Sequence, residues 1–198
     1  MEEHLSIASF PGMQGRTIIT SSLSKTFTVT GWRVGWAIAS ASIASAIRNI
    51  HVKLTDSAPA PFQEAALTAL DSPPDYFESL RRDYMEKRDY MVRVLIDVGF
   101  RVGFKPQGSF FILAELPENC PFSDIEFVEE LIKKARVAAV PGCGFFPALT
   151  SPKESPEMHR NYQNRYIRFA FCKSIATLNA AAQRMRKILD SRGCFKLN

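Results

Sequence analysis

A chain of 198 residues, with 46% hydrophobic and 23% charged residues, has the composition of a globular protein and room for one domain or two small ones. Its net charge of +5 is modest and spread over several segments, which favours anionic metabolites or a phosphorylated cofactor over nucleic acid. No apolar run reaches membrane-spanning length. The four cysteines and three histidines are too scattered for a metal site, and the acidic N-terminus resembles no signal or transit peptide.

Two short runs rich in β-branched residues, at 17–20 and 34–39, are predicted to be strands after an irregular start. The loop between them is rich in hydroxyl groups and contains Lys25. Ser22 precedes this lysine by three residues and Arg33 follows it by eight. A hydroxyl and a guanidinium can bind a phosphate, and a lysine that has lost its proton can form an imine with an aldehyde. The alternative is an ordinary hairpin with a solvated lysine.

Helices and strands alternate in the rest of the chain. Ser40 or Ser42 is expected to cap a helix that runs to about Leu54, and Pro61 suits the first turn of a helix at 62–70. The other predicted elements are a long helix at 75–98 ended by Gly99, strands at 100–104, 110–116, 137–140 and 166–171, a helix at 127–136 opened by the capping box of Ser123 and Glu126, a surface loop at 146–164, and a helix at 177–189 followed by a turn at Gly193. This order predicts an α/β or α+β unit with helices over a small sheet.

The residues around Lys25 carry a family resemblance. Residues 22–27 read Ser-x-Ser-Lys-Thr-Phe, and residues 30–36 read Thr-Gly-Trp-Arg-x-Gly-Trp. Together they resemble the pyridoxal-phosphate lysine motif of class I and II aminotransferases, and above all that of the kynurenine aminotransferase and glutamine transaminase K branch. The resemblance implies a Schiff base between pyridoxal 5'-phosphate and Lys25, with Ser22 and Arg33 on the cofactor phosphate.

A second stretch, residues 165–171, reads Arg-Tyr-Ile-Arg-Phe-Ala-Phe. Alternation along a strand places Arg168 opposite Ile167 and Phe169, where its guanidinium can hold a carboxylate with two parallel hydrogen bonds. Taken alone, an arginine on a strand is most often a surface residue. In the aminotransferases that this chain resembles, the arginine of the Tyr-Ile-Arg-Phe strand binds the substrate α-carboxylate, and Arg168 matches it.

Two shorter segments also resemble the family. Residues 108–111 are similar to the segment that lines the substrate entrance, and residues 141–145 to the loop after the short strand of the small domain. Both are weaker signals, because the glycine and phenylalanine residues there can simply serve a turn and a core. Cys143 is not assigned a catalytic role.

The resemblance covers the whole chain but only the C-terminal half of a typical family member. It implies the α/β architecture of a fold type I enzyme, with residues 1–71 as the C-terminal part of the cofactor-binding large domain and 72–198 as the small C-terminal domain. The strands at 17–20 and 34–39 resemble two strands that are not sheet neighbours in the family's seven-stranded sheet. No residues match the family's pyridine-nitrogen carboxylate, its stacked aromatic ring, or its asparagine and tyrosine at the cofactor oxygen. We therefore expect a truncated product, or a chain that needs a partner to complete its sheet.

Three functions stay open. The first is an aminotransferase that moves an amino group from an L-amino acid of the kynurenine, glutamine or aromatic type to a 2-oxo acid. The second is a related fold type I enzyme, such as a cysteine-conjugate β-lyase or an aminocyclopropane-carboxylate synthase. The third is a non-catalytic truncated isoform that modulates a full-length subunit. The implied partners are amino and 2-oxo acids and a second subunit, in a homodimer or a pair with a full-length chain. The expected compartment is intracellular: the cytoplasm, or an organelle if the full-length form carries a transit peptide.

Overall fold

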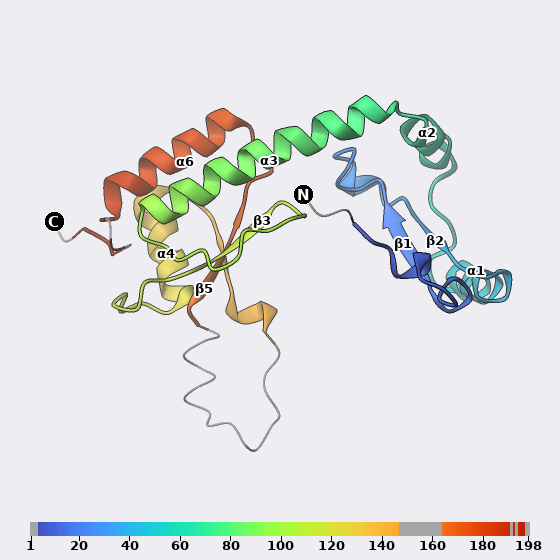
Figure 1. Ribbon diagram of the computed structural model, residues 1–198, viewed down its shortest axis with the longest axis horizontal. Coiled ribbons are helices and arrows are strands. Elements are labelled where there is room, and N and C mark those ends of the chain that lie inside the picture. Colours follow the sequence, from blue (N-terminus) through green and yellow to red (C-terminus); the bar gives the residue numbers. More distant parts are fainter. Residues whose placement is uncertain (1–3, 147–163, 191, 193, 197–198) are drawn as a thin grey trace, which may run out of the picture. The chain divides into compact units, whose positions relative to one another are not determined.

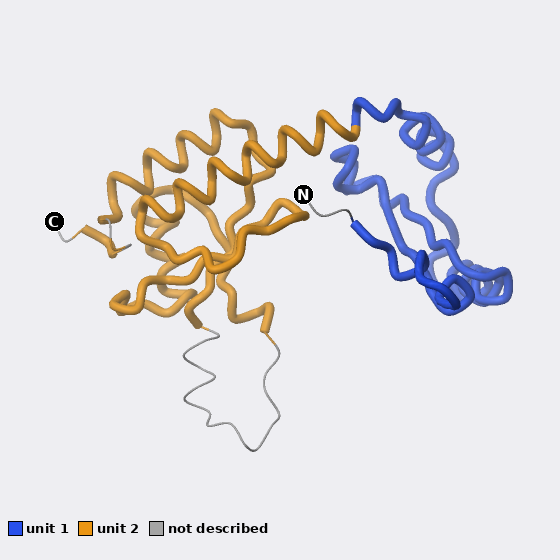
Figure 2. The backbone as a smooth tube through the Cα atoms, in the orientation of Figure 1, with its two compact units in different colours: residues 1–76 blue, residues 77–198 orange. Residues whose placement is uncertain are grey.

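The computed structural model divides into two compact units, residues 1–76 and 77–198, here called unit 1 and unit 2 (Figure 2). The structure describes residues 4–146, 164–190, 192 and 194–196. The predicted turn at Gly193 and nearly all of the predicted loop at 146–164 lie outside these residues. Among the helices described, none combines the length and the apolar character needed to cross a bilayer.

Unit 1 contains one antiparallel strand pair followed by two helices (Figure 1). Its elements in chain order are η1 (Ile7–Ser9), η2 (Gln14–Arg16), β1 (Ile19–Ser22), η3 (Thr30–Trp32), β2 (Gly35–Ile38), α1 (Ala41–Thr55) and α2 (Ala60–Leu70), where η marks a short 3₁₀ helix. Both predicted strands and both predicted helices are present. Pro61 lies in the first turn of α2, as expected, because a helix needs no N–H donor there.

Strands β1 and β2 pair directly with each other, with Ser22 opposite Gly35 and Ile19 opposite Ile38. In this chain, therefore, the two strands are sheet neighbours, unlike the two family strands that the resemblance assigned to them. The connecting loop lets the chain reverse, and the backbone N–H of Leu23 donates to the carbonyl of Val34 at 3.2 Å beyond the end of the ladder. Two antiparallel strands joined by such a loop pair locally, without a strand from elsewhere.

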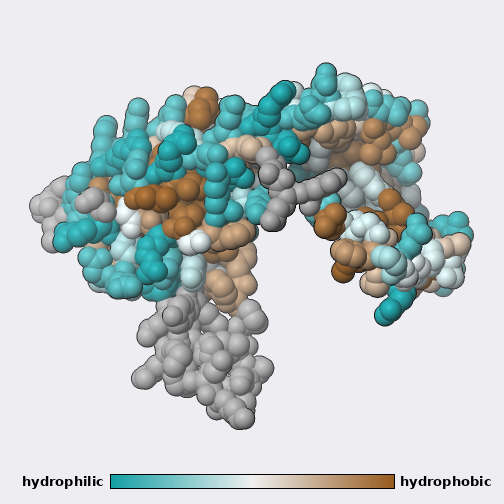
Figure 3. Space-filling view, viewed as in Figure 1, coloured by the Kyte–Doolittle hydropathy of each residue, from teal (hydrophilic) through white to brown (hydrophobic). Residues whose placement is uncertain are grey.

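Unit 1 has a small core. Among its described residues, Leu23, Val34 and Ala66 form the buried cluster. All of α1 is described and none of its side chains is buried. Ile50, at 59% exposure, and Leu54, at 77%, leave apolar surface of this helix open to solvent. Figure 3 shows apolar side chains on the visible surface of this unit. Unit 1 thus carries apolar surface that its own elements leave uncovered.

Unit 2 is a three-stranded antiparallel sheet in the order β3-β5-β4, with helices on one face (Figure 1). Its elements are α3 (Pro74–Asp97, whose first residues belong to unit 1), β3 (Phe111–Glu115), α4 (Asp124–Ala135), β4 (Val140–Pro141), η4 (Cys143–Phe145), β5 (Tyr166–Ala170) and α6 (Ile175–Ile188). Residues of α3, α4 and α6 share one buried cluster with Ile112, Ile167 and Phe169 of the sheet. The predicted mixed α/β unit with helices over a small sheet is confirmed.

Two helix ends follow their sequence signals. Gly99 ends α3 with a φ of +99°, and Phe100 N donates to Leu95 O at 2.9 Å. This is a Schellman motif, which glycine permits because it has no Cβ. At the start of α4, the Ser123 hydroxyl accepts from the backbone N–H of Glu126 at 3.3 Å, and the Glu126 carboxylate accepts from Ser123 N at 2.8 Å. The predicted capping box is therefore present.

Two predicted strands are wrong in extent. Residues 100–104 meet β3 only at the bridge between Arg101 and Glu115, because the segment then diverges around a hollow of about 360 Å³. The strand predicted at 137–140 begins only at Val140 and includes Pro141, one residue beyond its predicted end. Proline is tolerated there because β4 lies at the sheet edge, where its missing N–H leaves no partner unsatisfied.

Candidate active site

Lys25 lies in the turn that leaves β1, and its residue is exposed. This turn is held by its neighbours: the backbone N–H of Phe27 donates to Leu23 O at 3.1 Å, and the phenyl ring of Phe27 stacks on Tyr76 with centroids 5.3 Å apart. The Tyr76 hydroxyl in turn donates to the carbonyl of Thr26 at 2.9 Å. The backbone on the C-terminal side of Lys25 is thus anchored to the first turn of α3.

Ser22 and Arg33 lie at the same end of the strand pair as this turn. Ser22 is the last residue of β1 and faces Gly35, two residues after Arg33. Arg33 has a φ of +56°, in the left-handed region, and its Nη1 donates to Thr30 O at 3.1 Å. Both residues are exposed. Strand pairing therefore brings to one end of the hairpin two hydrogen-bond donors that can bind a phosphate, although they are eleven residues apart in the sequence.

A glycine permits the close approach of the two strands. A Cβ added at Gly35 would lie 2.7 Å from the carbonyl oxygen of Ser21, closer than real Cβ contacts. The pairing next to Ser22 therefore requires glycine at this position. A hydroxyl, a guanidinium and an amine then share one end of the hairpin, a donor set that suits an aldehyde with an anionic group.

Arg168 occupies the central strand of unit 2, paired between Leu113 of β3 and Val140 of β4. Its neighbours Ile167 and Phe169 are 0% and 3% exposed on the helix-covered face, so the predicted alternation is present. The side chain of Arg168 is on the opposite, open face and is half-buried. The structure therefore presents this guanidinium on the sheet face that the helices of unit 2 leave free.

Two aromatic rings hold the guanidinium of Arg168. Its Cζ lies 4.1 Å from the ring centroid of Phe111 and 4.4 Å from that of Phe145. Its Nε is buried and has no hydrogen-bond partner among the described residues. A buried donor normally has a partner, so a pre-positioned and unpaired Nε–H indicates a place for an acceptor such as a carboxylate.

The roles of these two rings were not predicted. The sequence signal is the weak resemblance of residues 108–111 and 141–145 to family segments, with a turn and a core as the alternative. Phe111 begins β3 with its side chain on the open face, and Phe145 ends η4. Only the pairing of β3 and β4 with β5 brings both rings to Arg168.

Asp124 is another residue whose role sequence reasoning missed. It is 0% exposed at the start of α4, and its Oδ2 accepts from the backbone N–H of Cys143 at 2.7 Å. Burial, and then the hydrogen bond and charge of Asp124, raise the pKa of the Cys143 thiol above its ordinary value. The capping-box pattern identifies Ser123 and Glu126, but nothing in the sequence indicates that Asp124, between them, is buried.

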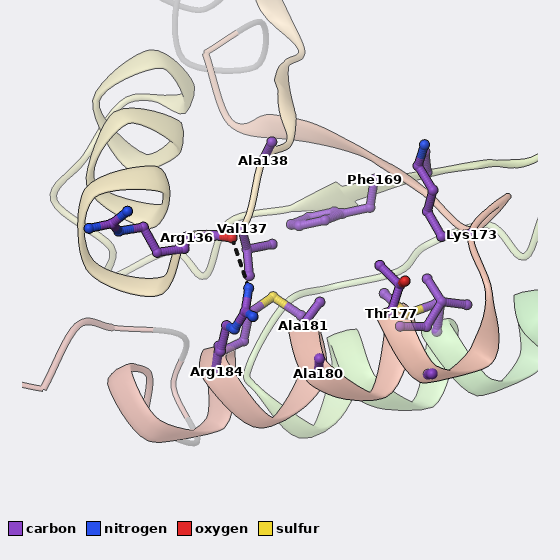
Figure 4. Close-up of a pocket in the computed structure, with 14 residues that line it drawn as sticks. Arg136, Val137, Ala138, Phe169, Lys173, Thr177, Ala180, Ala181 and Arg184 are labelled. Carbon is purple, nitrogen blue, oxygen red and sulfur yellow. Dashed lines mark hydrogen bonds between the residues drawn. The ribbon is translucent and has the colours of Figure 1, made fainter.

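Two hollows of unit 2 lie on opposite faces of its sheet. The one of about 360 Å³ is on the open face and is lined in part by Phe111 and Tyr166. The other, of about 560 Å³, is lined by α6 and by Phe169, which points to the helical face (Figure 4). There Arg184 donates to the backbone carbonyl of Arg136 at 3.3 Å, while the Arg136 guanidinium points away from the hollow. The polar groups drawn in Figure 4 do not converge, so this hollow is a poor candidate for the site.

The family follows from the sequence as a whole. Residues 4–184 match the family described as aminotransferase class I and II. Because this match covers most of the chain, the protein belongs to that family, whose members generally use pyridoxal phosphate.

Among its relatives, kynurenine–oxoglutarate transaminase 3 of Bos taurus is 33% identical over 199 residues, covering 91% of this chain and 41% of that protein. The probable N-succinyldiaminopimelate aminotransferase DapC of Mycobacterium tuberculosis is 35% identical over 189 residues, covering 94% of this chain and 46% of that protein. The chain thus spans less than half the length of these relatives. The resemblance to kynurenine aminotransferases is confirmed.

Solved structures agree on the fold. N-succinyldiaminopimelate aminotransferase from M. tuberculosis superposes with a TM-score of 0.79 at 34% identity, over 93% of this chain and 45% of that one. YbdL from Escherichia coli, described as a methionine aminotransferase, gives a TM-score of 0.78 at 32% identity, with the same coverage of 93% and 45%. The chain therefore has the architecture of part of a fold type I aminotransferase, as the resemblance implied.

Proposed function

We propose that this chain is the part of a pyridoxal-phosphate-dependent aminotransferase that carries the cofactor lysine and the substrate-carboxylate arginine. The reaction moves an amino group from an L-amino acid of the kynurenine, glutamine or aromatic type to a 2-oxo acid. The observation that carries the proposal is the β1–β2 pair, which brings Ser22 and Arg33 to the turn with Lys25 in a chain of this family. On this view residues 1–71 belong to the cofactor-binding domain and residues 72–198 to the small domain.

The donor set of the hairpin suits the cofactor. Pyridoxal phosphate, when bound, supplies the electron sink that lets an amino acid lose its Cα proton. The Nζ of Lys25 would bond to the aldehyde carbon, and the Ser22 hydroxyl and the Arg33 guanidinium would hold the phosphate. Arg33 donates to the Thr30 carbonyl through Nη1, which fixes the guanidinium, and its remaining N–H groups suit an anion.

Two side chains then act on the substrate. Arg168 binds the α-carboxylate through its guanidinium and orients the molecule so that the Cα–H bond points in the reactive direction. The Nζ of Lys25 would take the proton from the substrate Cα and give it to the cofactor carbon C4′, and it would carry a proton in the reverse direction when the 2-oxo acid is converted. Phe111 and Phe145 pack against the guanidinium and shield part of it from water, which strengthens its bond to a carboxylate.

The test is covalent labelling at Lys25. The chain is incubated with pyridoxal phosphate, reduced with borohydride, digested and analysed by mass spectrometry. The peptide with Lys25 should carry the phosphopyridoxyl group, Lys25→Ala should abolish the label, and the control Lys53→Ala, on the exposed end of α1, should keep it. A label at another lysine that persists in Lys25→Ala would overturn the assignment.

A second candidate function is non-catalytic pairing with a longer subunit, in which this chain modulates its partner. The exposed apolar side chains of α1 and the small core of unit 1 favour it, because a complementary surface would cover them. Absence of the Lys25 label together with co-purification of a longer subunit would select this function.

A related enzyme of the same fold would use the same lysine and arginine, so product analysis separates it from an aminotransferase. Amino-group transfer yields a new amino acid from the 2-oxo acid. A cysteine-conjugate β-lyase would release pyruvate and a thiol instead. An aminocyclopropane-carboxylate synthase would release the cyclic amino acid.

A further inference from the structure

We propose that Asp124 is a positioning residue for Arg168, which it reaches through the loop of residues 141–145. The carboxylate-binding role of Arg168 rests on the proposed function, whereas the mechanical link between Asp124 and Arg168 does not. The link has three steps: α4 holds the loop, the loop holds Phe145, and Phe145 holds the guanidinium.

The first step is the burial of Asp124. A buried carboxylate is costly unless hydrogen bonds replace its water, and this one is 0% exposed. Its Oδ1 accepts from Ile125 N at 3.0 Å and its Oδ2 from Cys143 N at 2.7 Å, a short bond to a charged acceptor. Ser123 and Glu126 already cap the helix, so capping does not explain Asp124. Its bond across to Cys143 does.

The second step is the fixed shape of the loop. Gly142 N donates to the carbonyl of Tyr166 in β5 at 2.7 Å, and a Cβ at Gly142 would collide with that carbonyl. The next residue, Cys143, is held by Asp124 from the other side. Phe145 N then donates to Gly142 O at 2.9 Å, which closes the single turn η4. With two consecutive residues anchored to different elements, the position of Phe145 is determined.

The third step is the contact with the arginine. The ring centroid of Phe145 lies 4.4 Å from Cζ of Arg168, and the ring centroid of Phe111 lies 4.1 Å from the same atom. Phe111 is fixed by the β3–β5 ladder, but Phe145 depends on the loop. If Asp124 no longer holds the loop, Arg168 loses one wall and gains rotamer freedom, and a bound carboxylate must then pay for ordering it.

The test observes Arg168 directly. In the 198-residue chain labelled with ¹⁵N-arginine, the buried Nε–H of Arg168 exchanges slowly enough to give a ¹⁵N–¹H correlation signal. This signal is assigned by its loss in Arg168→Lys. Ring currents from two phenyl groups should displace this signal from the other arginines. Phe145→Ala removes the ring of a residue that is 45% exposed, and it should move the Arg168 signal toward the signals of the other arginines. Asp124→Ala should displace the Arg168 signal as far as Phe145→Ala does. Asp124→Asn keeps one acceptor oxygen and should therefore displace the signal less.

The matched control is Ser123→Ala, which removes the cap of the same helix but leaves the bond to Cys143. It should lower stability without moving the Arg168 signal. If Asp124→Ala does not fold, Asp124→Asn and Phe145→Ala still decide the question. An unmoved Arg168 signal in folded Asp124→Asn and Asp124→Ala, or in Phe145→Ala, would overturn the proposal.

Binding of 3-phenylpropionate to the same variants separates the two proposals. Both Asp124 variants should weaken a measurable wild-type affinity, by about tenfold for Asp124→Ala. If the Arg168 signal is displaced in the variants but the wild-type chain binds no carboxylate, the link between Asp124 and Arg168 stands. The proposed carboxylate-binding role of Arg168 is then contradicted. Unchanged affinity in variants whose signal has moved would show that the link does not position Arg168 for the ligand, and would overturn the inference.

Discussion

The guanidinium of Arg168 lies flanked by two phenyl rings, at 4.1 and 4.4 Å from their centroids. Cation–π contact of this kind contributes about 0.5–2 kcal/mol and depends on the planar shape of the group. These ring contacts at Cζ leave the N–H donors at the edge of the guanidinium for a ligand. A planar carboxylate that accepts two parallel hydrogen bonds matches that edge.

Removing this guanidinium should therefore remove carboxylate affinity. Arg168→Ala should weaken binding of a 2-oxo acid by about 2–5 kcal/mol if the ion pair is buried, and Arg168→Lys should restore only part of it because an ammonium has no fork. Titration calorimetry measures both. Arg184→Ala, in the hollow on the other face of the sheet, is the control and should bind normally. Unchanged affinity in Arg168→Ala would exclude Arg168 from the site.

At the scale of the element, the start of α4 performs two separate tasks within four residues. Ser123 and Glu126 satisfy each other's backbone N–H groups, which stabilises the helix end. Asp124, between them, turns inward and bonds to the loop after β4. The first task is local and the second is tertiary, so they can be separated by substitution.

The capping box predicts a pH dependence. The backbone N–H of Ser123, and then its hydroxyl, hold the pKa of Glu126 below its ordinary value of 4.5. A carboxylate whose pKa is lowered on folding contributes stability that is fully present above 4.5 and is lost as the pH falls through its folded-state pKa. Glutamine accepts the same hydrogen bond without titrating.

The free energy of unfolding should therefore fall less steeply below pH 4.5 in Glu126→Gln than in the wild type. Urea denaturation followed by far-UV circular dichroism, at neutral and at acid pH, measures this. Glu86→Gln, on the exposed side of α3 and outside the capping box, serves as the control and should keep the wild-type slope. Equal slopes for Glu126→Gln and the wild type would contradict the prediction.

At the scale of the whole molecule, the two units have unequal cores. Among the described residues, unit 1 buries a cluster of Leu23, Val34 and Ala66, whereas twenty-two residues form the buried cluster of unit 2. Hydrophobic stabilisation grows with the apolar area removed from water. Unit 1 should therefore be the less stable of the two in the isolated chain.

Both tryptophans, Trp32 and Trp36, lie in unit 1, so their fluorescence reports on that unit alone. In a urea titration the fluorescence transition should occur at a lower concentration than the loss of helix signal that is dominated by unit 2. Phe127→Ala, in the core of unit 2, should shift the second transition and leave the first. Coincident transitions for fluorescence and circular dichroism would show instead that the two units unfold together.

Local signals predicted most of the elements, and non-local pairing accounts for the errors. Gly99, Pro61 and the Ser123 capping box act within one turn of helix, so their effects were readable from neighbouring residues. The strand expected at 100–104 failed because its partner, β3, accepts it at a single bridge. The segment keeps the right residue types for a strand, but a ladder also needs a neighbour at the correct distance.

By itself, the sequence determined the family and the approximate extents of the helices, and it singled out Lys25 and Arg168 as the expected site residues, since motifs and periodicity are properties of adjacent residues. Only the tertiary structure decided that β1 pairs with β2, that two phenyl rings flank Arg168, and that Asp124 is buried against the loop after β4. Each of these depends on segments far apart in the chain, which come together only when burial of apolar faces sets the order of strands.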